Sequence, residues 1–356
     1  MRHKLFIGYC LLVAVLFSCN SQTPQPSLQT TFYIYRFDPP AFIEFSKDFQ
    51  PVKEIPFSTP LNCGLLNTFA SPMGEQIVIE LNCPNGQTVL FLNTDTASTI
   101  QPITDADSHF LAWTSDGQAA YLKVDSLGNS HIARFNANRK NEVIPVTEFT
   151  YDLSTNPQNN DFTFAFSHGL GQGSELWLAK RDGKVVGQLY ADQFNYISFA
   201  HYSPDGNQIA FIKIPDTQTP FTVGELWVVN ADGSKGRKLT DVDAGHGYAA
   251  NWSPDGKKIA FVVRENSTDE RADQSSDALI SNIYIVDVES GALTPITHVE
   301  SGRVETPFWS PDGNTLAFNA VINDRMEVRI ADLITGEIRP LITESTCCPA
   351  WTRKRK

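Results

Sequence analysis

Positive charge is scarce in this sequence. Its 356 residues include 28 lysines and arginines against 40 aspartates and glutamates, which gives a formal net charge of -12. A nucleic-acid partner requires a basic face on the protein, so this balance argues against one. An acidic, self-repelling surface suits a soluble protein outside the cytoplasm.

A membrane-spanning run is lacking as well. The apolar stretch Leu5 to Phe17 is too short for a stable span, and it follows the positive segment Met1 to Lys4, as in an export signal. Its end, Leu16-Phe17-Ser18-Cys19, resembles a bacterial lipobox, which implies residues 1–18 as signal peptide and a lipid on the Cys19 thiol. An ordinary secretory peptide is the alternative. Either way we expect export, and with the lipid we expect anchoring to the cell envelope, in the periplasm or on the outer face of a membrane, through a flexible tether at 19–30.

Metal motifs are also missing. The six histidines that remain after processing show no pair at the close spacing of a metal site. The Asp-rich stretch within Arg264 to Ser281 lacks the Asp-x-Asp-x-Asp-Gly order of a calcium loop. We therefore expect no metal and no cofactor.

What the chain does contain is a repeat. Asn251 to Phe261 reads N-W-S-P-D-G-K-K-I-A-F, and close copies occupy His201 to Phe211 and Phe308 to Phe318. Ser-Pro-Asp-Gly is turn chemistry: Ser suits the first position, Pro pre-sets φ at the second, and Gly accepts the left-handed conformation. Each copy therefore predicts a hairpin between two apolar strands.

Weaker copies extend the repeat over the chain, and a second hairpin of alternating pattern follows each first one. The equivalent positions lie roughly 40 to 57 residues apart, the period of a four-stranded propeller blade. They are Ala70, Trp113, Leu153, Tyr202, Trp252, Trp309 and Trp351. The predicted fold is an all-β, seven-bladed β-propeller in a single domain over 31–352, followed by a basic tail at 353–356. Six blades is the alternative, if Tyr151 to Tyr190 does not form one.

The last blade is predicted to be shared by the two ends of the domain. Thr31 to Phe37 and the hairpin up to Ile55 supply three strands and lack the innermost one, whereas Trp351 marks an innermost strand with nothing after it. Pairing the two fragments closes the ring and removes the open edges.

Four cysteines remain after processing. Cys63 and Cys83 lie symmetrically about a degraded copy of the turn, Ser71-Pro72-Met73-Gly74, so they face each other across a hairpin and are expected to form a disulfide. Cys347 and Cys348 are adjacent in sequence. They either form a vicinal disulfide or stay reduced as two free thiols, and the sequence does not distinguish these alternatives.

These repeats resemble the TolB-type β-propeller repeat, a relative of the WD repeat. The signature is an aromatic residue, Ser-Pro-Asp-Gly, Ile-Ala-Phe, a strand such as Ile-Tyr-Val-Asp, a Gly turn and Leu-Thr; the copies at Trp252 and Trp309 follow it nearly residue for residue. The resemblance covers about Thr31 to Trp351 and implies the fold. The chain departs from TolB in lacking a separate N-terminal α/β domain, so a TolB role in envelope transport is not carried over.

Two enzyme families use similar propellers. Prolyl oligopeptidases add an α/β-hydrolase domain with a Gly-x-Ser-x-Gly elbow, and this sequence has neither. The glycine-rich Gly169 to Ser174 has the wrong spacing and no helix after it, so it is interpreted as a loop. Oligogalacturonate lyases use a histidine-based metal site, and histidines distant in sequence can converge at a propeller axis.

The segments that lead into the inner strands meet at one rim of a propeller, and here they hold polar side chains. The candidate ligand-binding residues at this channel mouth are His109, Tyr196, His246, Tyr248, Arg303, Glu305 and Glu344. Connections on the same rim lengthen at Pro215 to Gly224 and at Arg264 to Ser281, and insertions on one face often mark a binding face. The second is charged and Ser/Asp-rich, and we expect it to be a disordered, solvated loop.

Two functions follow, and a sensor or chaperone subunit of an envelope complex is a third possibility. The first is a monomeric, non-enzymatic scaffold that binds an envelope protein or peptide over the long-loop rim. The second is a carbohydrate-active or other small-ligand enzyme with its site near His109, His246, Arg303 and Glu305. Convergence of those side chains around an open pocket would favour the enzyme.

Overall fold

The computed structural model describes residues 29–71, 76–100, 108–124, 130–135, 141–144, 150–167, 171–217, 219, 221–244, 246 and 248–354. The predicted signal peptide, Cys19 and almost the whole tether lie outside these residues. Among the described residues there is no helix with the length and apolar character needed to cross a membrane.

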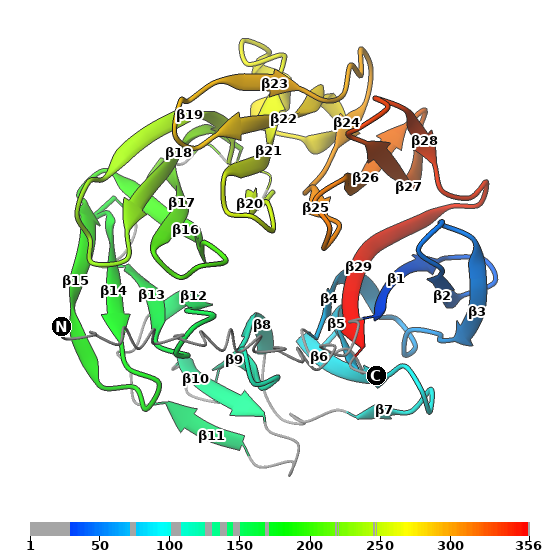
Figure 1. Ribbon diagram of the computed structural model, residues 1–356, viewed down its shortest axis with the longest axis horizontal. Coiled ribbons are helices and arrows are strands. Elements are labelled where there is room, and N and C mark those ends of the chain that lie inside the picture. Colours follow the sequence, from blue (N-terminus) through cyan, green and yellow to red (C-terminus); the bar gives the residue numbers. More distant parts are fainter. Residues whose placement is uncertain are drawn as a thin grey trace, which may run out of the picture.

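Seven small antiparallel sheets form a ring, which confirms the seven-bladed β-propeller (Figure 1). We number the blades 1 to 7 in the order in which the chain completes them and give the strands of each from the axis outward. Blade 1 is β4 (Gly64–Ala70), β5 (Gln76–Cys83), β6 (Gly86–Asn93) and β7 (Thr99–Ile100); blade 2 is β8 (Ser108–Trp113), β9 (Ala119–Val124), β10 (Ser130–Phe135) and β11 (Asn141–Ile144); blade 3 is β12 (Thr150–Thr155), β13 (Phe162–Ser167), β14 (Ser174–Ala179) and β15 (Val185–Asp192). Blade 4 is β16 (Asn195–Tyr202), β17 (Gln208–Pro215), β18 (Val223–Asn230) and β19 (Arg237–Asp243); blade 5 is β20 (Asn251–Trp252), β21 (Lys258–Arg264), β22 (Ser281–Asp287) and β23 (Leu293–Pro295). Blade 6 has an interrupted inner strand, β24 (Arg303–Val304) and β25 (Phe308–Trp309), then β26 (Thr315–Ile322), β27 (Arg325–Asp332) and β28 (Ile338–Pro340); blade 7 is β29 (Thr346–Lys354), β1 (Gln29–Arg36), β2 (Ala41–Phe45) and β3 (Pro51–Pro56).

Blade 7 is assembled from both ends of the domain, as predicted. The innermost strand β29 pairs with β1, so that Phe32 lies opposite Trp351 with ring centroids 4.3 Å apart. In Figure 1 the red β29 runs beside the blue β1. The six-blade alternative was wrong, because the segment from Tyr151 to Tyr190 forms blade 3.

The Ser-Pro-Asp-Gly turns are held by their own side chains. In blade 5, Ser253 Oγ donates to Asp255 Oδ1 at 2.6 Å and accepts from the backbone N–H of Lys258 at 2.9 Å, while Gly256 has φ 71°. The same bonds recur at Ser203 and at Ser310. The turn chemistry therefore fixes where each inner strand ends.

The tryptophans before the turns of blades 5 and 6 link each blade to the preceding one. Trp252 Nε1 donates to the carbonyl of His201, and Trp309 Nε1 donates to the carbonyl of Asn251, both at 3.0 Å. Apolar clusters fill the spaces between neighbouring blades; Phe261, for example, packs in one cluster with Leu226 of the preceding blade. The core is thus a ring of layers between sheets and not one central core.

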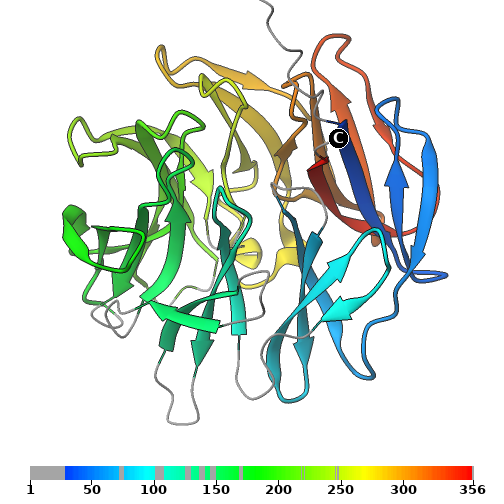
Figure 2. The ribbon, with the colours of Figure 1, turned by 60° about the horizontal axis from the view of Figure 1, so that its bottom comes forward.

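Antiparallel strands give the ring two different rims (Figure 2). The turn rim carries the Ser-Pro-Asp-Gly turns between β16 and β17, β20 and β21, and β25 and β26. The loop rim is the opposite one, where β17 joins β18, where β21 joins β22, and where the chain enters β20 and β24. Because Gln29 pairs with Lys354, β1 begins and β29 ends at the turn rim.

The wall of the channel holds two titratable groups with opposite shifts. In β12, Asp152 accepts hydrogen bonds from the backbone N–H groups of Leu153 at 2.8 Å and of Ala200 at 3.0 Å. Burial raises the pKa of Asp152 to about 6, and burial lowers the pKa of His201 in β16 to about 4. The folded state therefore favours the neutral form of each.

These shifts predict compensating pH dependences. The Asp152 contribution to stability is full below pH 4 and is lost as pH rises to 6, whereas the His201 contribution is full above pH 6.5 and is lost as pH falls to 4. Each amounts to about 3 kcal/mol at most. We expect Asp152→Asn to become more stable relative to wild type as pH rises from 4 to 6.5. We expect His201→Asn to become less stable relative to wild type over the same rise in pH. Urea unfolding across this range measures both differences; parallel curves for variant and wild type would contradict the assignment.

Candidate functional site

The loop rim of blades 4, 5 and 6 carries a cluster of polar and aromatic side chains. Four residues predicted for the channel mouth meet here: His246 and Tyr248 before β20, Arg303 in β24, and Glu305 just after β24. We call these four, together with Phe221, Asp243 and Asn319, the rim cluster.

The first part of the rim cluster is a buried His–Asp pair. His246 Nδ1 lies 2.9 Å from each carboxylate oxygen of Asp243, and the two side chains are 2% and 0% exposed. The Phe221 ring stacks on the imidazole, with centroids 4.3 Å apart and planes 4° apart. Because a carboxylate only accepts, Nδ1 is the donor, and in the neutral ring Nε2 then carries the lone pair. Nε2 is buried and has no hydrogen-bond partner in the described structure.

The second part is an arginine held between blades. Arg303 Nε lies 3.4 Å from Glu305 Oε1, and Arg303 Nη1 donates to the carbonyl of Ser276 at 3.3 Å.

Tyr248 lies beside this pair and beside the histidine. Its ring is stacked relative to that of His246, with ring centroids 6.0 Å apart. Burial, and after it the charge of Glu305, raises the pKa of Tyr248, so its hydroxyl stays protonated and can donate.

The cluster continues into blade 7. Asn319 Nδ2 donates to Glu305 Oε2 at 3.2 Å, and Asn319 Oδ1 accepts from the backbone N–H of Cys348 at 2.9 Å. The carbonyl of Cys348 accepts from Thr68 Oγ1 of blade 1 at 2.9 Å. A connected set of side-chain bonds thus links the inner strands of blades 6, 7 and 1 near the loop rim.

The structure contains two disulfides, Cys63–Cys83 within blade 1 and the vicinal Cys347–Cys348 at the start of β29. Cys347 and Cys348 are 3% and 8% exposed. The β1–β29 register shifts between Tyr33 and Tyr35, and Cys348 has φ 66° there. The vicinal pair therefore occupies an irregularity in the strand that closes the ring.

The expectation of a disordered loop between Arg264 and Ser281 was wrong. The segment contains two short 3-10 helices, η1 (Glu270–Asp273) and η2 (Ser276–Ala278). Arg264 Nη1 binds Asp273 at 2.6 Å, and Ala272 and Leu279 are buried. The Ser/Asp-rich composition that looked solvated supplies helix caps, through Asp269 and Ser275.

The described contacts of the other three predicted residues are with residues outside the rim cluster. His109 is in β8, close enough to interact with the buried carboxylate of Glu80. Tyr196 is in β16, with its ring 6.2 Å from that of Tyr151. Glu344 is exposed and accepts from Thr343 at 3.1 Å.

Sequence reasoning missed Phe221, Asp243 and Asn319. Asp243 stands three residues before His246, and a carboxylate at that distance from a histidine is a signal that could have been used. Phe221 and Asn319 are distant in sequence from their partners, so only the packing of the blades brings them in.

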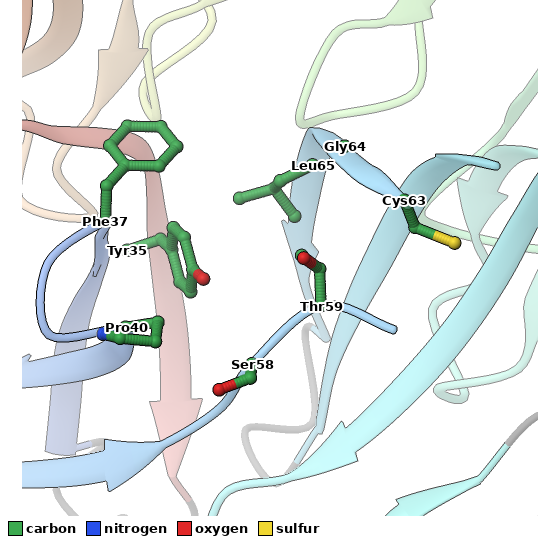
Figure 3. Close-up of a pocket in the computed structure, with 8 residues that line it drawn as sticks. All are labelled: Tyr35, Phe37, Pro40, Ser58, Thr59, Cys63, Gly64 and Leu65. Atoms are coloured by element: carbon green, nitrogen blue, oxygen red, sulfur yellow. The ribbon is translucent and has the colours of Figure 1, made fainter. Parts of the chain in front are cut away.

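The loop rim has a hollow between blades 7 and 1. It encloses about 300 Å³ and is lined by Tyr35, Phe37, Pro40, Ser58, Thr59, Cys63, Gly64 and Leu65. Figure 3 shows the side chains of Tyr35 and Leu65 pointing toward each other across it. Its wall is aromatic and aliphatic, and the hydroxyls of Ser58 and Thr59 add polar groups.

The described residues include no group of three histidine, cysteine, aspartate or glutamate side chains placed to hold a metal ion. What the rim cluster offers chemically is a buried base, a paired cation and a hydroxyl donor on three neighbouring blades. Such a set can recognise a ligand that presents both donors and acceptors.

Comparisons with known proteins give the fold. No protein-family model matches the chain. A stretch of 88 residues is 38% identical to the uncharacterized peptidase YuxL of Bacillus subtilis, which is 23% of this chain and only 13% of that protein. Among solved structures, TolB from Acinetobacter baumannii is 17% identical over 88% of this chain and 78% of TolB, with a TM-score of 0.49.

An oligogalacturonate lyase from Vibrio parahaemolyticus is 14% identical over 89% of this chain and 86% of the lyase, with a TM-score of 0.53. At such identities the likeness shows the fold alone. What the lyase shares with this chain is the propeller scaffold.

The His246–Asp243 pair predicts a specific pattern of stability. Asp243→Ala leaves the buried Nδ1–H without an acceptor and should lower the free energy of unfolding by about 1–3 kcal/mol. The double variant Asp243→Val, His246→Phe removes both polar groups and keeps a ring against Phe221, so it should recover to within about 1 kcal/mol of wild type. Urea unfolding measures the free energy of unfolding of both variants. A double variant as unstable as the single one would show that the two side chains do not satisfy each other's hydrogen bonds.

Proposed function

We propose that this protein is an exported, lipid-anchored β-propeller that binds a protein or peptide of the cell envelope on its loop rim. The observation that carries the proposal is the ordered construction of that rim. The connection from β21 to β22 is folded and capped, and Arg303 ties it to the inner strand of blade 6. An ordered rim presents its groups without the entropy cost of fixing a flexible loop on binding.

The position of the predicted tether supports this orientation. Residues 19–30 run into β1, which begins at the turn rim. A lipid on Cys19 would therefore hold the turn rim toward the membrane and leave the loop rim facing away from it, where a large partner has room.

Exposed charged side chains lie on the loop rim above the rim cluster. Arg271, with its side chain 84% exposed, and Asp277, with its side chain 91% exposed, stand on the two 3-10 helices. Exposed charges at the edge of an interface affect the rate and specificity of association more than they affect its strength. The buried aromatic and paired groups below them would give the interface its fixed shape.

Charge reversal on the rim tests the proposal. The variant Glu270→Lys, Arg271→Glu, Asp277→Lys changes exposed residues of η1 and η2, and Lys257→Glu, Glu289→Lys, Glu337→Lys is the control on exposed residues of the turn rim, with the same change in net charge. We expect at least about a tenfold loss of partner recovery from envelope extract with the first variant and none with the control. Recovery of every partner in equal amounts with both variants would remove the loop rim from the proposal.

One observation favours a second function, a carbohydrate-active or other small-ligand enzyme. The pair formed by Asp243 and His246 has the arrangement of a general base, with Nδ1 held and Nε2 carrying the lone pair. Because Nε2 is buried, a substrate would reach it only after the side chains that cover it move. Turnover of polygalacturonate by wild type that is lost in His246→Gln would favour this function over the scaffold.

A further inference from the structure

The hollow between blades 7 and 1 lies on the loop rim, and none of its lining residues belongs to the rim cluster. Its volume of about 300 Å³ stands at the lower end of the range of ligand pockets, which is about 300–1,000 Å³. The hollow therefore has room for one large side chain or for a group of similar size.

The first wall of the hollow follows the end of β1, and its aromatic rings are held in place. The Tyr35 hydroxyl donates to the carbonyl of Phe57 at 3.3 Å. The backbone N–H of Phe37 donates to the carbonyl of Ser345 at 3.2 Å. The rings of Tyr35 and Phe37 meet edge to face, with centroids 5.4 Å apart, and line one side of the hollow (Figure 3).

The second wall is the segment that leads into β4, together with the first residues of that strand. The disulfide from Cys63 to Cys83 ties this segment to β5, and the Cys63 backbone N–H donates to the carbonyl of Pro60 at 3.0 Å. Leu65 packs against the buried cluster that contains Tyr35. Because both walls are fixed before binding, an occupant does not have to order them.

Apolar side chains are exposed on both sides of the hollow. Phe37 is 41% exposed on the first wall, and Leu61, in the segment of the second wall, is 89% exposed. Exposed apolar surface beside a pocket is typical of an interaction site.

The surroundings of the first wall are acidic. Arg36 is buried between the two aromatic residues in sequence, and its guanidinium donates to both carboxylate oxygens of Glu54, at 3.0 and 2.8 Å. The hydrogen bond to Glu54, and beyond it the charges of Glu54, Glu344 and Asp38, raise the pKa of Arg36. One buried cation is thus set against three exposed carboxylates, which leaves negative charge beside the hollow.

We propose that this hollow binds a bulky apolar side chain of a partner protein, flanked in the partner's sequence by lysine or arginine. The fixed aromatic and aliphatic walls select the apolar side chain. The carboxylates of Asp38, Glu54 and Glu344 select its basic neighbours. The net charge of -12 favours the approach of such a segment.

This binding mode rests on the proposed function, because both use the loop rim as the face that meets a partner, and it adds the chemistry of the bound segment. The two can fail separately. Recovery of a partner that depends on the charges of η1 and η2 but is the same with Phe37→Ala would leave the proposed function intact and overturn the binding mode.

The probe is the peptide acetyl-Gly-Lys-Phe-Lys-Gly-amide with 4-fluorophenylalanine as its aromatic residue, and its matched control carries glutamate in place of both lysines. The full mature chain is added to each peptide while the ¹⁹F signal is followed. We expect saturable binding of the lysine peptide and at least about tenfold weaker binding of the glutamate peptide, since like charges then meet. A peptide with alanine in place of the aromatic residue should not displace the probe at a roughly tenfold excess, because it has no side chain to fill the hollow.

A change in the first wall assigns the binding to the hollow. Phe37→Ala removes an aromatic ring from that wall and should weaken binding about tenfold. Phe194→Ala is the matched control, since it removes a phenylalanine that is 78% exposed at the entry to β16 on the same rim, and it should bind as wild type does. Thermal unfolding of each variant checks that it is folded.

A change in charge tests the second half of the proposal and stands on its own should Phe37→Ala fail to fold. The pair Asp38→Asn, Glu344→Gln should weaken binding of the lysine peptide about fivefold. The pair Asp277→Asn, Glu300→Gln removes the same charge from exposed residues elsewhere on the loop rim and should leave binding unchanged. Equal binding of the lysine and glutamate peptides, wild-type binding by a folded Phe37→Ala, or equal losses in the two charge pairs would overturn the proposal.

Discussion

Closure of the ring between β1 and β29 is the constraint on which the rest of the structure depends. A propeller whose ends did not pair would expose the backbone edge of an inner strand and one face of a blade. Here the pairing of Phe32 with Trp351 seals the last blade, and the same strand carries Cys347 and Cys348 up to the loop rim. Closure also puts the start of β1 at the turn rim, which decides how the domain would be held by an anchored tether.

Once the ring is closed, neighbouring blades build sites that no single blade contains. The rim cluster takes Phe221 and Asp243 from blade 4, His246 from the entry to blade 5, and Arg303 from blade 6. Its charges are paired and hydrogen-bonded, as buried charges must be, since desolvation is costly for an ion without a partner. Only His246 Nε2 in that group is buried without a partner in the described structure.

Repetition within the chain also allows equivalent positions of two blades to be compared. The third strands of blades 3 and 4 share a tryptophan anchored by a glutamate, and their differences fall on the residues that face it. In blade 4, Lys213 lies over the tryptophan ring and Lys238 binds the glutamate. In blade 3 a phenylalanine and a glutamine stand at those positions. The same Glu-Leu-Trp feature is thus packed against different neighbours in two blades of one repeat protein.

The sequence by itself determined the all-β fold, the period of the repeat, the seven blades and the shared last blade. It could do so because turn chemistry and strand alternation are local, and because each Ser-Pro-Asp-Gly copy repeats the same local information. The meeting of His246, Tyr248, Arg303 and Glu305 also follows from the order of the blades, since segments at equivalent positions reach the same rim. Only the tertiary structure decided that the described contacts of His109, Tyr196 and Glu344 are with residues outside the cluster, that Asp243 and Phe221 complete the cluster, and that the segment from Arg264 to Ser281 is ordered. Those outcomes depend on side-chain packing between blades, and partners that are distant in sequence leave no local pattern by which to find them.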